Sequence, residues 1–286
     1  MDDFAPRLLH WYAAHRRDLP WRRPGVGAWG VLVSEVMLQQ TPAARVEPVW
    51  HEWLRRWPEP AALAAEVPGE AVRAWGRLGY PRRALRLHQA ATFIVEWHGG
   101  VVPSSYDELR ALPGIGDYTA AAVAAFAYGQ REAVLDTNAR RVYRRVFDGT
   151  DDSTSAPTVA ERAAARARVP TRRPGAYAVA VMELGALVCT ARSPDCTRCP
   201  VRDLCRWSAA GHPVATRRRA AQRYEGTDRQ ARGRLLAVLR ERSAPVGWPD
   251  LEPAWHDAAQ RARAMDSLVA DGLVEPLARG RFRLPS

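Results

Sequence analysis

A single carboxylate, Glu35, interrupts an apolar run in the stretch WGVLVSEVMLQQT. On a helix, its neighbours three and four residues away are Val31, Leu32, Leu38 and Gln39. Mostly apolar surroundings disfavour a charged carboxylate, so we expect a raised pKa and a protonated Glu35 near neutral pH. Such a group can act as a general acid. The competing interpretation is a buried glutamate with a structural hydrogen bond.

A second carboxylate, Asp136, stands in the sequence LDTN at the start of a predicted helix. Aspartate is a good N-cap residue because its side chain accepts hydrogen bonds from the first helical turn. The positive end of the helix dipole also favours an ionised carboxylate. We therefore expect Asp136 to stay charged. A plain helix cap is the competing interpretation, and the two roles are compatible.

The four cysteines all lie in one short stretch, CTARSPDCTRCPVRDLC. Thiols gathered in one loop of an intracellular chain are more typical of a metal site than of disulfides. The spacing C-x6-C-x2-C-x5-C admits zinc or an iron–sulfur cluster. Structural zinc usually shows two close cysteine pairs, and only one is present, which favours a [4Fe–4S] cluster. The predicted ligands are Cys189, Cys196, Cys199 and Cys205.

The sequence ELRALPGIGDYTAAAVAAFAYG predicts a helix, a tight turn and a second helix. Gly114 and Gly116 let the turn backbone approach a partner closely. The start of the second helix would then present backbone N–H groups and a positive dipole end to a phosphate. This arrangement holds DNA without reading its sequence. An ordinary helix–helix turn is the alternative, and Asp117 disfavours an anion unless its carboxylate turns away.

Composition points to a polyanionic partner. The formal net charge is +11, and all 42 basic residues are arginines. Arginine forks suit phosphate oxygens, although a solvated basic surface is also possible. The absence of lysine removes any lysine Schiff-base chemistry. No apolar run approaches the ~18 residues of a membrane span, and we see no signal peptide, so we expect a cytoplasmic protein with no membrane partner.

Helical periodicity dominates the first 210 residues, without a convincing alternating strand or an internal repeat. Prolines and glycines separate the predicted helices. A polar loop is expected at 148–158 and a basic linker at 213–227. The predicted helices span 4–15, 28–40, 43–57, 70–78, 82–97, 105–112, 117–128, 137–147, 157–168 and 176–189.

The last 59 residues, 228–286, have a pattern of their own. Two helix-like stretches, RQARGRLLAVLRER and HDAAQRARAMDSLVADG, are followed by two short strands around Arg279 and Gly280. Two helices and a hairpin predict a small winged-helix-like α+β tail. A helical appendage with an irregular end is the alternative.

Several motifs in order resemble one superfamily. LPGIGDYTA, LDTNARRV and the cysteine loop resemble the helix-hairpin-helix DNA glycosylases, and LPW, SEVMLQQT and LGY narrow the resemblance to the adenine DNA glycosylase (MutY) branch. The resemblance covers roughly residues 8–210. It implies an all-α fold, in which a six-helix barrel domain and an iron–sulfur cluster domain flank a cleft for a flipped-out base. The predicted domains are the barrel with its hairpin (26–130), the cluster domain (1–25 and 131–212), the linker and the tail.

The resemblance also implies roles for individual residues. Glu35 would protonate the departing adenine and later help to activate water. Asp136 would stabilise an oxocarbenium-like state or add to the sugar, and Asn138 would help to hold the site. Tyr118 stands where related bifunctional enzymes carry a nucleophilic lysine, so hydrolysis without efficient strand cleavage is expected. Its alternative is a core aromatic with a satisfied hydroxyl.

A second group of residues matches the positions that surround the flipped base. Gln40, Thr41, Leu78 and Tyr80 would fill or wedge the base stack, and Trp21 and Arg23 would line the adenine pocket unless they serve in ordinary packing. The chain departs from the family at Val179, where a polar residue is usual and Glu183 is a candidate substitute, and at Pro81.

The family's usual C-terminal Nudix-like domain cannot be encoded in so short a tail. Selectivity for 8-oxoguanine is therefore expected to be weaker, or to depend on Gln40, Thr41 and Tyr80 or on the basic tail. The implied partner is double-stranded DNA with A:8-oxoG or A:G mismatches, bound by a monomer associated with the bacterial nucleoid. The alternatives are a thymine or uracil glycosylase acting on G mismatches and a non-catalytic iron–sulfur DNA-binding regulator.

Overall fold

A computed structural model of the chain describes residues 3–151, 156–213 and 224–286. Two compact units are present. The cluster unit comprises Met1–Val31, Ser104–Ala111 and Ile115–Ala220, and the barrel unit comprises Leu32–Pro103, Leu112–Gly114 and Ala221–Ser286.

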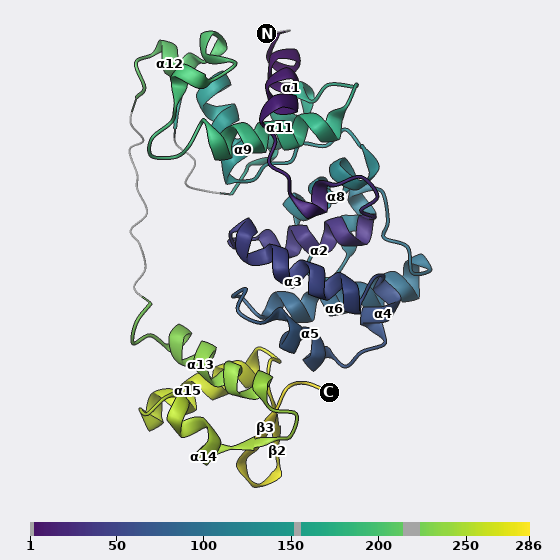
Figure 1. The fold of residues 1–286 in the computed structure, drawn as a ribbon, viewed down its shortest axis with the longest axis vertical. Coiled ribbons are helices and arrows are strands. Elements are labelled where there is room, and N and C mark those ends of the chain that lie inside the picture. Colours follow the sequence, from purple (N-terminus) through teal and green to yellow (C-terminus); the bar gives the residue numbers. More distant parts are fainter. Residues whose placement is uncertain (1–2, 152–155, 214–223) are drawn as a thin grey trace. The chain divides into compact units, whose positions relative to one another are not determined.

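The cluster unit is built around three helices, α1 (Phe4–His15), α9 (Thr137–Tyr143) and α11 (Pro174–Leu187), which pack together (Figure 1). Leu8, Val142 and Leu184 lie at the centre of their shared core. The other elements of this unit are η1 (Pro20–Arg22), α7 (Tyr106–Ala111), α8 (Asp117–Tyr128), η2 (Arg144–Asp148), α10 (Val159–Arg168), η3 (Cys196–Arg198), η4 (Arg202–Leu204) and α12 (Arg206–Ala209).

Local sequence explains where several of these helices begin. Asp136 caps α9 by accepting a hydrogen bond from Ala139 N at 2.6 Å. Thr158 and Glu161 form a capping box at the start of α10. α9 continues directly into η2, a single π-helical turn, and such turns often occur at functional sites.

The barrel unit contains α3 (Ala43–Arg56), α4 (Pro60–Ala64), α5 (Pro68–Trp75) and α6 (Arg82–His98), while α2 (Ala28–Leu38) starts in the cluster unit and ends here. Three buried tryptophans lie in its core: Trp53 meets Trp57 and Trp75 edge to face, with ring centroids 4.7 and 5.7 Å apart. Such aromatic pairs add to the stabilisation from burial alone.

The C-terminal tail, which clusters with the barrel unit, has winged-helix topology. Its sheet has the antiparallel order β1-β3-β2, and Phe282 of β3 pairs with Val246 on one side and Pro276 on the other. The tail elements are α13 (Asp228–Glu241), β1 (Val246–Gly247), α14 (Trp248–Leu251), η5 (Glu252–Ala254), α15 (Ala258–Ala270), β2 (Glu275–Leu277), η6 (Ala278–Gly280) and β3 (Arg281–Arg283).

The long predicted helices are present with ends that differ by a few residues, and strands in the described residues occur only in the tail. The prediction missed α4, η1, β1 and α14, because elements of two to five residues show no periodicity. Most of the predicted linker, including 214–223, and residues 152–155 of the polar loop lie outside the described residues. No helix in the described part of the chain is long and apolar enough to cross a membrane.

Candidate active site and iron–sulfur loop

Glu35 is buried within α2. Only 4% of its surface is exposed. Of its helix neighbours three and four residues away, Val31 and Leu32 are buried, and Leu38 and Gln39 are half-buried. The acid role of Glu35 stays a prediction.

The end of α2 is tied to the loop between α5 and α6. Arg83 donates hydrogen bonds to the carbonyl oxygens of Val36 at 3.0 Å, Gln39, and Gly79 at 3.3 Å. Thr41 Oγ1 donates to the carbonyl oxygen of Leu78 at 3.0 Å. Burial lowers the pKa of the Arg83 guanidinium. These bonds hold the two predicted base-stack segments, 39–41 and 78–80, beside each other.

Of the four predicted stack residues, two are buried and two are exposed. Thr41 and Leu78 lie in the interior, whereas Gln40 is exposed and Tyr80 is 53% exposed. Gln40 and Tyr80 both adopt left-handed backbone conformations, with φ of 58° and 45°. Such conformations are costly for residues other than glycine and tend to occur at functional sites.

Of the two hairpin glycines, Gly114 has a backbone conformation that favours glycine, whereas Gly116 has an extended backbone and open space at its Cβ position. Gly114 has φ of 76°, and a Cβ there would lie 2.6 Å from Arg86 Cβ. Gly116 stands at the N-cap of α8 without a side-chain cap. The Asp117 carboxylate is held away by Arg110 at 2.7 Å and Tyr106 at 3.2 Å, and the hydrogen bond from Arg110 lowers the pKa of Asp117. This pairing weakens its repulsion of a phosphate at the turn.

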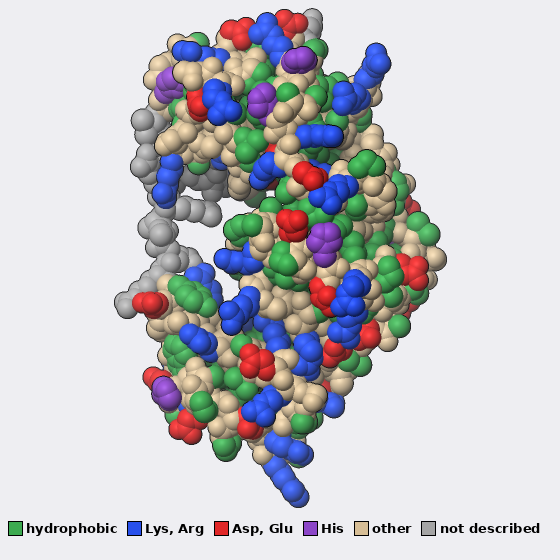
Figure 2. Space-filling view, in the orientation of Figure 1, with side chains coloured by type: hydrophobic (Ala, Val, Ile, Leu, Met, Phe, Trp, Pro, Cys, Tyr) green, Lys and Arg blue, Asp and Glu red, His purple; other side chains and the backbone are tan. Residues whose placement is uncertain are grey.

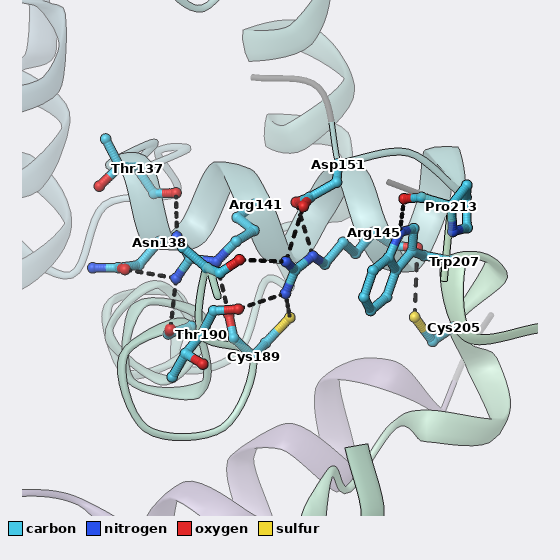
Figure 3. A network of polar contacts seen from close by, with 12 residues as sticks. Thr137, Asn138, Arg141, Arg145, Asp151, Cys189, Thr190, Cys205, Trp207 and Pro213 are labelled. Atoms are coloured by element: carbon cyan, nitrogen blue, oxygen red, sulfur yellow. Dashed lines mark hydrogen bonds and ion pairs between the residues drawn. The ribbon is translucent and has the colours of Figure 1, made fainter. Parts of the chain in front are cut away.

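Asp136 belongs to a chain of hydrogen bonds that reaches the cysteine loop. Figure 3 shows the part of this chain from Asn138 through Arg141 to Cys189. Asn138 Nδ2 donates to Asp136 Oδ2 at 3.0 Å, and Arg141 donates to Asn138 Oδ1 at 2.8 Å and to the Cys189 carbonyl oxygen at 2.7 Å. Burial raises the pKa of Asp136 above its ordinary value and outweighs the hydrogen bonds from Ala139 and Asn138, which lower it. The ionised state of Asp136 stays a prediction.

Arg145 forms a second link between η2 and the cysteine loop (Figure 3). Its guanidinium donates to Cys189 Sγ at 3.4 Å and to the Thr190 carbonyl oxygen at 2.8 Å, pairs with Asp151 at 2.9 Å, and lies 4.3 Å from the Trp207 ring centroid. An almost fully buried arginine is rare unless it is paired, and here each side of the fork has a partner.

The four cysteines line one cavity next to Val146, Leu184 and Trp207. Burial raises the pKa of the Cys199 thiol to about 11, and burial likewise raises the pKa values of Cys196 and Cys205. Thiolates in this place need a positive partner, which a bound metal centre would supply.

No group of three or more His, Cys, Asp or Glu side chains among the described residues could hold a single metal ion. Held by the four thiolates, a cluster would keep the loop in one shape. The loop arginines Arg192, Arg198, Arg202 and Arg206 are all exposed.

Tyr118 and Trp21 both lie in the cluster unit. Tyr118 is half-buried and packs against the alanine-rich face of α8 and Ala178 of α11. Trp21 is buried in η1. Arg23 is exposed and is ion-paired with Asp18 at 2.7 Å.

Glu183, the candidate substitute for the missing polar residue, is buried and ion-paired. Its buried carboxylate accepts hydrogen bonds from Arg17 at 2.8 Å and Arg22 at 2.9 Å, so it fixes the segment that carries Trp21. The neighbouring family departure, Val179, is buried in α11.

Sequence reasoning missed Arg83, Arg141 and Arg145. The signal for Arg141 was its place three residues after Asn138, which is one turn along the same helix face. Nothing in the sequence marks Arg83 or Arg145 among 42 arginines.

Comparisons with known proteins agree with this geometry. Residues 33–166 match the HhH-GPD superfamily of base excision DNA repair proteins, and residues 189–205 match the iron–sulfur binding domain of endonuclease III. The second match confirms the prediction of a [4Fe–4S] cluster rather than zinc at the four cysteines.

Two relatives match almost the whole chain, tail included. The adenine DNA glycosylase of Mycolicibacterium smegmatis is 55% identical over 278 residues, 97% of this chain and 94% of that protein. The enzyme of the same name from Mycobacterium tuberculosis H37Rv is 53% identical over 281 residues, 97% and 92%. A thermostable thymine-DNA glycosylase structure matches with a TM-score of 0.68 and 27% identity, covering 73% of this chain and 96% of that one. The predicted fold class is confirmed, and the chain belongs to the adenine DNA glycosylase family within the HhH-GPD superfamily.

Proposed function

We propose that this protein hydrolyses the N-glycosidic bond of adenine in duplex DNA, in base excision repair, when the adenine is mispaired with 8-oxoguanine or guanine. The observation that carries the proposal is the 55% identity to an adenine DNA glycosylase over 97% of the chain. We further propose that it acts in the cytoplasm, at the nucleoid, and that it is a monomer. Light scattering of the free and DNA-bound protein would test the monomeric state.

The proposed chemistry uses the two carboxyl groups in different protonation states. Glu35 transfers a proton to adenine as the bond from the base to the sugar breaks. Asp136, ionised, stabilises the positive charge that develops on the sugar or adds to it covalently. Water then bonds to the sugar carbon, and the Glu35 carboxylate accepts a proton from it.

Several described features support these roles. Glu35 is buried beside apolar side chains. The Asp136 carboxylate accepts hydrogen bonds from Ala139 N and Asn138 Nδ2, which favour its ionised form and offset part of the larger effect of burial on its pKa. The chain contains no lysine that could open the sugar through a Schiff base, and Tyr118 occupies the position after the hairpin.

The test is base release from four duplexes that contain A:8-oxoG, A:G, T:G or U:G, read by strand cleavage after alkali. We expect release from the first two. Glu35→Gln should abolish release and leave duplex binding nearly intact, whereas Glu96→Gln, at an exposed position, should behave as the parent protein. Turnover by Glu35→Gln comparable to the parent would remove Glu35 from the acid role.

A second candidate function is removal of thymine or uracil opposite guanine. The likeness to a thymine-DNA glycosylase structure favours it. Release from T:G or U:G without release from A:8-oxoG would support this candidate and contradict our proposal. Release from none of the four duplexes would indicate a non-catalytic DNA-binding protein.

A further inference from the structure

The barrel unit contains a large cleft between the tail and the barrel helices. Its volume is about 1140 Å³. One wall is α13 of the tail, and the other is formed by Gln40, the loop between α5 and α6, and the start of α6. Among the described residues, nine arginines and two carboxylates line it. Figure 2 shows basic side chains gathered where α13 lies beside the barrel helices.

The tail wall is firmly attached. The Arg240 guanidinium donates to the carbonyl oxygens of Val72 at 2.9 Å and Gly76 at 2.5 Å, and burial lowers the pKa of Arg240 to about 10. Gly69 N donates a hydrogen bond to the Pro285 carbonyl oxygen at 2.8 Å. A side chain at residue 69 would block this contact, because its Cβ would lie 2.4 Å from that oxygen. A buried polar contact of this kind holds the two walls at one separation.

Most of the positive charge in the cleft is not neutralised within the described residues. Of the two carboxylates, Asp271 already pairs with Arg82 at 3.1 Å and Arg232 at 2.5 Å. Five exposed arginines have no carboxylate partner there: Arg45, Arg77, Arg86, Arg229 and Arg234. An array of this kind attracts a chain of phosphates.

Two exposed tyrosines accompany these arginines. Tyr80 is 53% exposed and Tyr224 is 49% exposed, one on each wall. The Arg83 guanidinium lies 5.0 Å from the Tyr80 ring centroid, and Arg229 lies 5.0 Å from that of Tyr224. Exposed rings between arginines are the means by which proteins stack the bases of an unpaired strand.

We propose that this cleft binds one strand of DNA, with its arginines on the phosphates and its tyrosines against bases. The tail is then a second DNA-binding element, separate from the hairpin. The inference rests on the proposed function only in taking DNA as the substrate.

The test compares two double variants in the full chain. Arg229→Ala/Arg234→Ala alters the cleft, and Arg263→Ala/Arg281→Ala removes two exposed tail arginines that do not line it. Binding of a fluorescent A:8-oxoG duplex is measured by anisotropy in the Glu35→Gln background, so that no base is released. Because binding is read without turnover, failure of the proposed chemistry would not affect this result.

Each lost phosphate contact lowers the slope of log affinity against log salt by about 0.9. The cleft variant loses two contacts. We therefore expect its affinity to fall by a factor roughly 12-fold smaller than that of the parent between about 50 and 200 mM salt. The control variant should match the parent. Equal slopes for the parent and the cleft variant, or equal losses in both double variants, would overturn the proposal. The first of these outcomes would fit an acidic protein partner.

Two further arms test the strand and the stacking. Neutral methylphosphonate linkages are placed in one DNA strand at a time, and binding of the parent protein is measured. They should reproduce the loss of affinity seen in the cleft variant when they lie in one of the two strands only. Equal effects from both strands would contradict a single-strand site. Tyr224→Leu should lower affinity about fivefold or more with the salt slope unchanged, because stacking carries no charge. Unchanged affinity in this variant would remove the stacking role.

Discussion

Replacing Glu183 by glutamine tests how the segment bearing Trp21 is held. Glu183 Oε1 accepts hydrogen bonds from Arg17 N at 2.9 Å and Arg17 Nε at 2.8 Å, and Oε2 accepts from Arg17 Nη2 at 2.8 Å and Arg22 Nη1 at 2.9 Å. Glutamine keeps the shape but removes the charge. Its amide NH2 group would also face the N–H donors of Arg17 and Arg22, to which it cannot bond. The loss should therefore exceed that of a neutral hydrogen bond.

The size of the effect follows from the titration of the group. Burial raises the pKa of Glu183, but the hydrogen bonds from Arg17 and the charge of Arg22 outweigh it and lower the pKa from 4.5 to about 2. A difference of roughly 2.5 units corresponds to about 3 kcal/mol. Because the Arg17 side chain is 41% exposed, water screens part of this, and we expect about 2 to 3 kcal/mol at pH 7.

The sign of the pH dependence follows from the lowered pKa. The stabilisation is present above the unfolded-state value near 4.5 and is lost as the pH falls toward 2. The difference between the parent and Glu183→Gln should shrink by about 1 kcal/mol between about pH 7 and pH 3.5.

Urea unfolding of the parent, Glu183→Gln and the exposed control Glu96→Gln at both pH values measures these quantities. We expect a lower midpoint for Glu183→Gln only. A loss that does not change with pH, or an equal loss in Glu96→Gln, would show that the ion pairs with Arg17 and Arg22 contribute little to stability.

Three other substitutions test the links between helices and the cysteine loop. Arg145→Met should lower the free energy of unfolding by about 3 to 5 kcal/mol, because it leaves Asp151 and the loop carbonyls without their donor. It should also speed the loss of the iron–sulfur absorbance in air. The control Arg192→Met, at an exposed position, should change neither quantity. Gly185→Ala should lower the free energy of unfolding, measured by thermal unfolding, by about 1 to 3 kcal/mol, since its Cβ would lie 2.7 Å from the Asn138 carbonyl oxygen. The control Gly233→Ala in α13, whose Cβ would lie 3.5 Å from Tyr224 Oη, should stabilise the protein slightly. Cys199→Ser should lower the iron content and the melting temperature together; full iron content in this variant would exclude Cys199 as a ligand.

Features that depend on near neighbours were predictable from the sequence. The Asp136 cap, the Gly114 turn and the cysteine loop each depend on residues within a few positions of one another. The long helices show periodicity over three or more turns, so they were found to within a few residues. Shorter elements such as α4 and β1 lack that signal and were missed.

Contacts between distant residues were decided by the tertiary structure alone. Glu183, considered from the sequence as a base contact, became a structural ion pair because packing brings Arg17 to it from 166 residues away. Arg83, Arg145 and Arg240 resemble every other arginine in a chain that has 42. Only folding determines which guanidinium groups lose their water and must bond to backbone oxygens instead, and which stay exposed with their charge available to a phosphate.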